Sequence, residues 1–138
     1  MCYNKGTMGE EIRTHRSIDQ SLSGKPKEVR DRYALVVLTT DDRMGADDKG
    51  LVHGGFIFSA ADYAAMLSVN SPTVVLAGAN VKFLKPVVVG DTVEFEAKVV
   101  KEDGKKKIVM VIGRKDGYKV FEGEFICVVL GKHVLDRS

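Results

Sequence analysis

The sequence predicts an α+β domain in which a curved antiparallel sheet wraps around one long buried helix. Residues 54–70 are rich in alanine and apolar on nearly every side, which is typical of a helix that is buried all round. The pattern of residues 74–130 then predicts four successive strand segments. Such a helix needs a sheet that curves about it and a second subunit beyond that sheet.

Length and composition restrict the class of protein. The 138 residues fit one domain and leave no room for a second, so residues 1–138 are predicted to form a single unit. A net charge of +2 does not favour nucleic acid as a partner. Cys2 and Cys127 lie near opposite ends of the chain and form no metal or redox motif. There is no leader-like or membrane-spanning apolar segment, so we expect a cytoplasmic protein that binds no membrane.

The first third of the chain is predicted to contain one strand. Residues 1–31 form a polar extension, in which residues 10–22 have a modest helical pattern that ends at a Gly-Lys-Pro segment. Residues 33–40 are apolar and β-branched, which indicates a strand. Residues 41–50 contain four aspartates, but their spacing does not match a calcium-binding loop, so a solvated loop is the preferred interpretation.

The remaining elements follow from local turn signals. The long helix ends before Pro72, because a residue that precedes proline is driven out of the α region. Residues 74–89 form a strand region that is interrupted at Pro86. Asp-Gly pairs between strand-like segments predict tight hairpins. The resulting antiparallel meander has strands at 93–102, 106–115 and 118–130.

Two segments resemble a known family. Residues 50–62 contain Gly50, a His53-Gly54-Gly55 triplet and an aspartate at position 62, and residues 80–91 contain a proline followed by a Gly-Asp turn. Together they resemble the hotdog-fold acyl-CoA thioesterases of the PaaI-like (phenylacetate-pathway) type, over roughly residues 33–130. The resemblance implies a hotdog fold, an acyl-CoA substrate and a homodimer that pairs again into a homotetramer. It implies no cofactor, since coenzyme A is part of the substrate.

Asp62 is the main catalytic candidate. It is the one charged residue between His53 and Lys82, and its helix otherwise carries apolar side chains. The residues alone leave two readings open, a functional acid or a carboxylate that points into a wet crevice or caps a neighbouring loop. Apolar surroundings should raise its pKa. The resemblance implies that Asp62 acts as a general base or as a nucleophile on a small or aromatic acyl thioester.

The start of the helix is the second candidate. Its first N–H groups have no partner within the helix, and glycine lets a carbonyl oxygen approach them, although an ordinary Gly-rich turn would look the same. The resemblance implies that the Gly54 N–H is the oxyanion donor and that His53 orients the loop or the carbonyl. Gly55, Asp47 and Asn80 are predicted to contact substrate; many relatives have Asn at position 47. No metal site is predicted. One or two lysines or arginines could bind the phosphates of coenzyme A.

The active site is predicted to be shared between two chains. Gly54 and Asp62 are eight residues apart, about 12 Å along a helix, so one carbonyl cannot contact both. Antiparallel helices from two copies would bring Asp62 of one chain beside Gly54 of the other. The alternative is a non-catalytic acyl-CoA-binding protein that resembles the fatty-acid regulators of this fold. Those regulators carry Asn at the acid position and a DNA-binding domain, for which residues 1–31 are too short.

Overall fold

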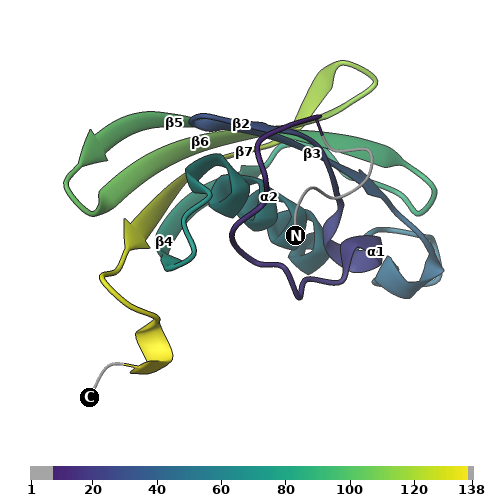
Figure 1. Ribbon diagram of the computed structural model, residues 1–138. Helices are drawn as coiled ribbons and strands as arrows, with labels where there is room; N and C mark the ends of the chain where they lie inside the picture. The colour runs from purple at the N-terminus through teal and green to yellow at the C-terminus, as the bar shows by residue number, and fades with distance from the viewer. Residues whose placement is uncertain (1–7, 137–138) are drawn as a thin grey trace.

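A computed structural model describes residues 8–136 and shows one seven-stranded sheet that arches over a single long helix, α2 (Gly54–Val69) (Figure 1). The strand order is β1-β2-β3-β5-β6-β7-β4, and all neighbouring pairs are antiparallel except β1 with β2. This is the predicted hotdog arrangement. The single-domain prediction for residues 1–138 stays a prediction, because residues 1–7 and 137–138 lie outside the described residues.

Four strands follow α2 in the chain, as predicted. The strands are β1 (Met8–Gly9), β2 (Lys25–Arg30), β3 (Tyr33–Thr39), β4 (Val74–Phe83), β5 (Thr92–Asp103), β6 (Lys106–Lys115) and β7 (Tyr118–Val129). The short helical elements are α1 (Gln20–Ser23), η1 (Asp42–Met44) and η2 (Val134–Asp136).

The predicted meander of β5, β6 and β7 is confirmed. The register pairs Asp103 with Lys106 and Lys115 with Tyr118, so each hairpin has a two-residue turn. Gly117 has a φ of 85°, a conformation that suits glycine and explains the Asp-Gly signal. Alternate residues of β5 are buried, which puts one face of the sheet against α2.

Two predictions near the ends of elements are correct only in part. Residues 10–22 are helical only at Gln20–Ser23, and Lys25–Arg30 form a strand that pairs with β3. The Gly-Lys-Pro segment ends the short helix as predicted, with Gly24 as the C-cap of α1, and its Lys-Pro part also starts the strand. The strand region predicted for residues 74–89 ends at Phe83, and the following residues make one isolated pairing, Leu51 with Val88.

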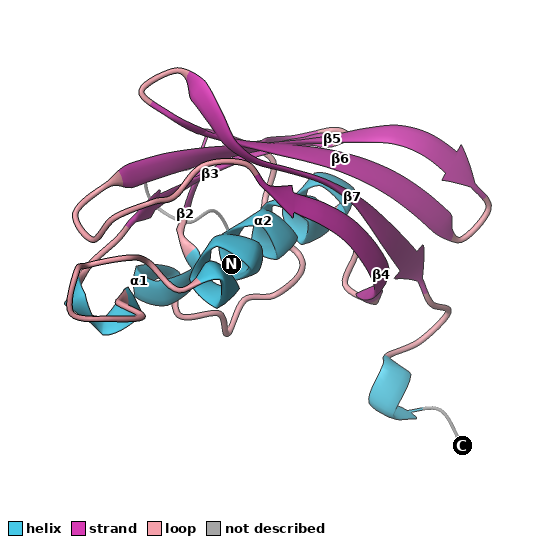
Figure 2. Ribbon diagram, turned by 180° about the vertical axis from the view of Figure 1, so that it is seen from behind, coloured by secondary structure: helices cyan, strands magenta, loops and turns pink. Residues whose placement is uncertain are grey.

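An N-terminal strap, defined here as residues 10–24, crosses α2 outside the sheet (Figure 2). Ile12 of the strap is buried in the same core as the helix. The strap is tied to the end of α2, where the side chain of Asn70 accepts from Arg13 N–H at 2.8 Å and donates to the Glu11 carbonyl at 2.9 Å. The sheet and the strap therefore enclose α2 from two sides.

One stripe of α2 is less covered than the rest. Gly55 is exposed, and Phe58, Ser59 and Asp62 are half-buried, whereas Ala60, Ala61 and residues 63–68 are buried. Their spacing of three or four residues places the stripe along one side of the helix. The Phe58 ring packs on Phe125 of β7, 5.5 Å between centroids, and β7 is the neighbour of the edge strand β4. Beyond its first turn, the helix is thus buried on all sides but this one.

Candidate active site

Asp62 lies in the middle of α2, on the less covered stripe. Burial among apolar groups raises the pKa of its carboxyl to about 6. Its Oδ1 atom is buried and has no hydrogen-bond partner among residues 8–136. A buried carboxylate without a donor is costly, which makes it a candidate for function rather than for structure.

Cys127 lies close enough to Asp62 for the charge of that carboxylate to affect the pKa of its thiol. Burial and the nearby carboxylate raise the pKa of its thiol to about 12, so the thiol stays protonated at neutral pH. The side chain is fully buried. Cys127 is therefore a small core residue, and its protonated thiol is a poor nucleophile.

Side chains of α1 hold the turns of α2 on either side of Asp62. Ser23 and Ser59 share a hydrogen bond of 2.8 Å between their hydroxyl oxygens. Gln20 donates to the hydroxyl of Tyr63 at 3.3 Å. These contacts were not foreseen from the sequence, because nothing local in the strap indicates that it lies against α2.

The first turn of α2 presents free backbone donors. Helix geometry leaves Gly54 N–H and Gly55 N–H without an intrahelical partner, and neither donates to a loop or turn carbonyl. The exposed His53 precedes the helix, donates its own N–H to the Met44 carbonyl at 2.8 Å and makes no side-chain cap. A Cβ on Gly55 would lie 2.9 Å from His53 Nε2. Glycine at position 55 is thus what allows the imidazole to fold back over the helix start.

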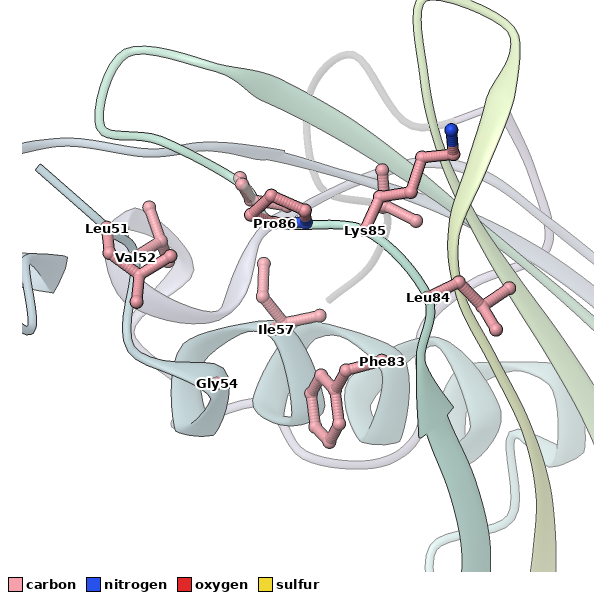
Figure 3. A pocket seen from close by; sticks show the side chains of 10 residues that line it. Leu51, Val52, Gly54, Ile57, Phe83, Leu84, Lys85 and Pro86 are labelled. Atoms are coloured by element: carbon pink, nitrogen blue, oxygen red, sulfur yellow. The ribbon is translucent and has the colours of Figure 1, made fainter.

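An open apolar pocket of about 330 Å³ adjoins this helix start (Figure 3). Gly54 and Ile57 of α2 face Phe83, so that a Cβ on Gly54 would lie 3.4 Å from the Phe83 ring. Lys85 is the one charged residue among the described residues that line the pocket. The full lining is Leu51, Val52, Gly54, Ile57, Phe83, Leu84, Lys85, Pro86, Val87 and Val120.

Asp47 shapes the loop that leads to His53. Its Oδ1 accepts the backbone N–H groups of Lys49, at 3.0 Å, and Leu51, at 3.1 Å. An asparagine could accept the same two bonds through its amide oxygen. The structure therefore gives Asp47 a structural task for which Asp and Asn are equally suited.

Asn80 is not brought to the other candidates within one chain. Its register partner in β7 is Glu124, which is exposed, whereas the neighbouring Ala79 pairs with the buried Phe125. Directly opposite residues of paired strands share a face, so Asn80 lies on the face of the sheet away from α2.

The unbroken helix keeps Gly54 and Asp62 apart. Eight residues at the helical rise correspond to about 12 Å. Among residues 8–136 there is no cluster of three or more potential metal ligands. Within the same range, no helix has the length and apolar character that a membrane crossing requires.

Comparison with known proteins gives a family match over the site. Residues 49–112 match the family model described as Thioesterase superfamily, a stretch that includes His53, Gly54 and Asp62. Over 120 residues the chain is 64% identical to a protein of Aquifex aeolicus named methylthioribose-1-phosphate isomerase, covering 87% of this chain and 26% of that protein. It is 33% identical over 98 residues to the transcription factor FapR of Caldanaerobacter subterraneus, covering 71% and 48% respectively. The chain thus spans about a quarter and about half of these two relatives.

Solved structures cover the chain more fully. An uncharacterized protein, PH1136 of Pyrococcus horikoshii, is 53% identical, with a TM-score of 0.92 and coverage of 94% of this chain and 99% of that one. The E. coli PaaI protein from the phenylacetic acid degradation operon is 22% identical, with a TM-score of 0.75 and coverage of 83% and 84%. A hypothetical thioesterase from Streptococcus pneumoniae, solved with coenzyme A, is 20% identical, with a TM-score of 0.72 and coverage of 79% and 87%. The last two show likeness of fold.

The order of elements agrees with these matches. The family match begins just before α2 and ends within β6, so it contains the buried helix and the start of the meander. The sheet that curves around this helix is the fold shared with PaaI and with the hypothetical thioesterase of S. pneumoniae. Residues 49–112 of the chain thus match the thioesterase superfamily, and the whole domain has the hotdog fold of the solved structures that it resembles.

Proposed function

We propose that this protein is an acyl-CoA thioesterase that hydrolyses a small or aromatic acyl thioester. The observation that carries the proposal is the Asp62 carboxyl, half-buried on an otherwise apolar helix, with an unpartnered oxygen and a pKa raised to about 6. A carboxyl with that pKa is mostly ionised at neutral pH and is yet a stronger base than an exposed aspartate. The open pocket at the start of α2 supplies an apolar surface for the acyl group.

Two reaction routes use the same residues. In the first, Asp62 removes a proton from water as the water oxygen attacks the thioester carbonyl, and the Gly54 N–H of the partner chain donates to the oxyanion. The C–S bond then breaks, and the CoA thiolate takes the proton back from Asp62. In the second, Asp62 attacks the carbonyl, expels the CoA thiolate and forms an anhydride that water hydrolyses. Both routes end with a carboxylic acid and free coenzyme A, without a further cofactor.

The proposed site needs two copies of the chain. Phe58 lies midway between Gly54 and Asp62, and a two-fold axis beside it makes the two α2 helices antiparallel. Phe58 packs on Phe125, whose register partner in β4 is Ala79, so the same axis passes close to Ala79. The free edges of the two β4 strands then meet antiparallel and extend the sheet, which satisfies their unpaired backbone groups. Two such dimers are proposed to pair into a tetramer.

The pieces around this site have distinct tasks. The loop ordered by Asp47 sets the position of His53, and the absence of a side chain at Gly55 leaves room for the imidazole. Lys85 stands at the pocket as a cation suited to a phosphate of coenzyme A. The S. pneumoniae protein of this fold that was solved with coenzyme A supports an acyl-CoA ligand.

Turnover of a panel of acyl-CoA substrates tests the proposal. Acyl groups from acetyl to medium-chain and aromatic acids are supplied, and free coenzyme A is measured spectrophotometrically with a thiol reagent. We expect hydrolysis of at least one substrate by the wild-type protein and loss of that activity in Asp62→Asn. Binding of acyl-CoA by calorimetry without hydrolysis of any member would refute the enzymatic assignment.

A second candidate is a ligand-sensing protein that binds acyl-CoA without turning it over. The similarity to the transcription factor FapR favours it, because the 98 matched residues lie within this fold. The panel distinguishes the two candidates. A sensor would bind the ligand with equal affinity in wild-type protein and in Asp62→Asn, and would release no coenzyme A from either.

A further inference from the structure

Apolar side chains are left uncovered in two places that lie at opposite ends of β4. Three exposed residues, Leu51, Phe83 and Leu84, line the pocket at the start of α2, and Phe83 is 54% exposed. At the other end lies the C-terminal arm, defined here as residues 130–136, which carries Val134 and Leu135. Leu135 is 84% exposed. Clustered apolar surface of this kind marks an interaction site.

The arm is ordered although it is uncovered. Thr73, just before β4, fixes its origin, since the Thr73 hydroxyl donates to the Leu130 carbonyl at 2.6 Å. Further along, the backbone N–H of Leu135 donates to His133 Nδ1 at 3.0 Å. Figure 1 shows the arm leaving the end of β7 and extending away from the body of the molecule. A hydrogen-bonded turn that holds a leucine out in water points to a surface that the leucine contacts.

The two-fold axis of the proposed dimer locates that surface. Ala79 lies at the axis, and Val74 and Leu84 are the same number of residues away from it in opposite directions. Antiparallel pairing of two β4 strands therefore sets Val74 of one chain near Leu84 of the other. Val74 pairs with Val129, where the arm begins. The arm of each chain thus starts beside the pocket of its partner.

We propose that the C-terminal arm of one chain docks on the rim of the partner's pocket, with Leu135 packed against the partner's exposed Phe83 and Leu84. This inference rests on the proposed dimer and adds a second contribution from the partner. The pocket is open in a single chain, and the docked arm would form its missing outer wall over the Gly54 N–H. Leu135 then limits the size of the acyl group, and expulsion of water by this wall strengthens the oxyanion contact.

Disulfide trapping between differently tagged chains tests the contact without recourse to activity. One chain carries Leu135→Cys and the other carries Leu84→Cys, in a Cys2→Ser background that retains the buried Cys127. Both substituted side chains are exposed, so the substitutions should leave the fold intact, which circular dichroism checks. We expect most of the mixed dimer to become covalent under mild oxidation. Val100→Cys, an exposed apolar position on β5, replaces Leu135→Cys as the matched control and should give no product.

A separate variant, Ala79→Cys, reports on the dimer itself. It should form a covalent homodimer through the two-fold axis. If Ala79→Cys links and the Leu135–Leu84 pair does not, the docked arm is wrong and the shared-site dimer stands. If neither links, both are wrong. If Val100→Cys forms a disulfide with Leu84→Cys as often as Leu135→Cys does, the links reflect random collision, and the docked arm is also wrong.

The affinity of the dimer and the substrate preference give a second readout. Leu135→Ser should weaken dimerisation by roughly tenfold or more, measured by sedimentation equilibrium, because each chain loses one buried leucine side chain. It should also widen the range of acyl groups that are hydrolysed, whereas Val100→Ser should change neither property. Unchanged dimer affinity and unchanged acyl preference in Leu135→Ser would refute the arm as a wall of the site.

Discussion

Replacement of Asp62 by asparagine should stabilise the protein at neutral pH while it removes activity. The carboxyl is half-buried without a hydrogen-bond partner for Oδ1, so its charge is poorly solvated in the folded chain. Asparagine has nearly the same shape and no charge. The variant therefore separates the cost of the buried charge from the cost of the buried polar group.

The size of the effect follows from the two pKa values. The pKa is 3.8 in an unperturbed aspartate and about 6 in the fold. Between these values the folded chain holds a proton that the unfolded chain has lost, so the free energy of unfolding falls as the pH rises. The difference of about two units corresponds to about 3 kcal/mol, lost by wild type between roughly pH 4 and pH 6. The free energy of unfolding of Asp62→Asn should not show this fall.

Urea denaturation of both proteins at pH 4 and at pH 8, at a fixed protein concentration, measures this change in the free energy of unfolding. We expect the variant's advantage to grow by up to about 3 kcal/mol from the lower to the higher pH. Asp48→Asn, which removes an exposed carboxylate, controls for the substitution itself. In the same pH range kcat of wild type should show an acidic limb near pH 6, which should be absent from any residual activity of Asp62→Asn. An advantage that is equal at both pH values would show that Asp62 is not a buried charge in the folded protein.

Three further predictions address the rest of the site. A mixed dimer of Asp62→Asn and Gly54→Pro chains should regain about half of the wild-type activity per dimer, because both substitutions fall in one of its two sites and the other site is intact. A mixed dimer without activity would refute the shared site. Gly55→Ala should lower kcat while the thermal midpoint changes little, since the new Cβ displaces the imidazole beside it; Gly131→Ala, with open space around its Cβ, is the control. Asp47→Asn should keep stability and activity, whereas Asp47→Ala should destabilise the protein by about 1–3 kcal/mol in urea denaturation, because two backbone N–H groups lose their acceptor. Equal stability of the two Asp47 variants would contradict the loop-ordering role.

The parts of the fold that sequence reasoning identified are those with local causes. The Asp-Gly turns and the alternation of β5 fix the meander, and the apolar residues of α2 mark it as buried. Strand β2 was missed because its pairing partner, β3, supplies the reason for its conformation. The strap is likewise held by Asn70, more than fifty residues away, through bonds that no local pattern encodes.

The same distinction applies to the site. Asp62 stood out because a single charge in an apolar helix is visible in the sequence. The face on which Asn80 lies was not predictable by counting alternate residues, because β4 contains an irregularity between Leu76 and Gly78 that shifts the alternation by one. The tasks of Gln20 and Ser23 depend on where the strap crosses α2, which is a tertiary feature.

Asn70 anchors the first part of the strap, residues 11–13, to the end of α2. Its backbone has left-handed dihedral angles that end α2, while both polar atoms of its side chain are bonded to the strap. Loss of this one side chain's contacts would release residues 11–13 together, while Gln20 and Ser23 still hold the rest of the strap. Opening of this first part is therefore a local event with a free energy below that of global unfolding. The Arg13 amide proton, which is bonded to Asn70 Oδ1, is therefore a reporter of that event in native-state hydrogen exchange. Its exchange rate measures how often the face of α2 opposite the sheet becomes accessible in the folded protein.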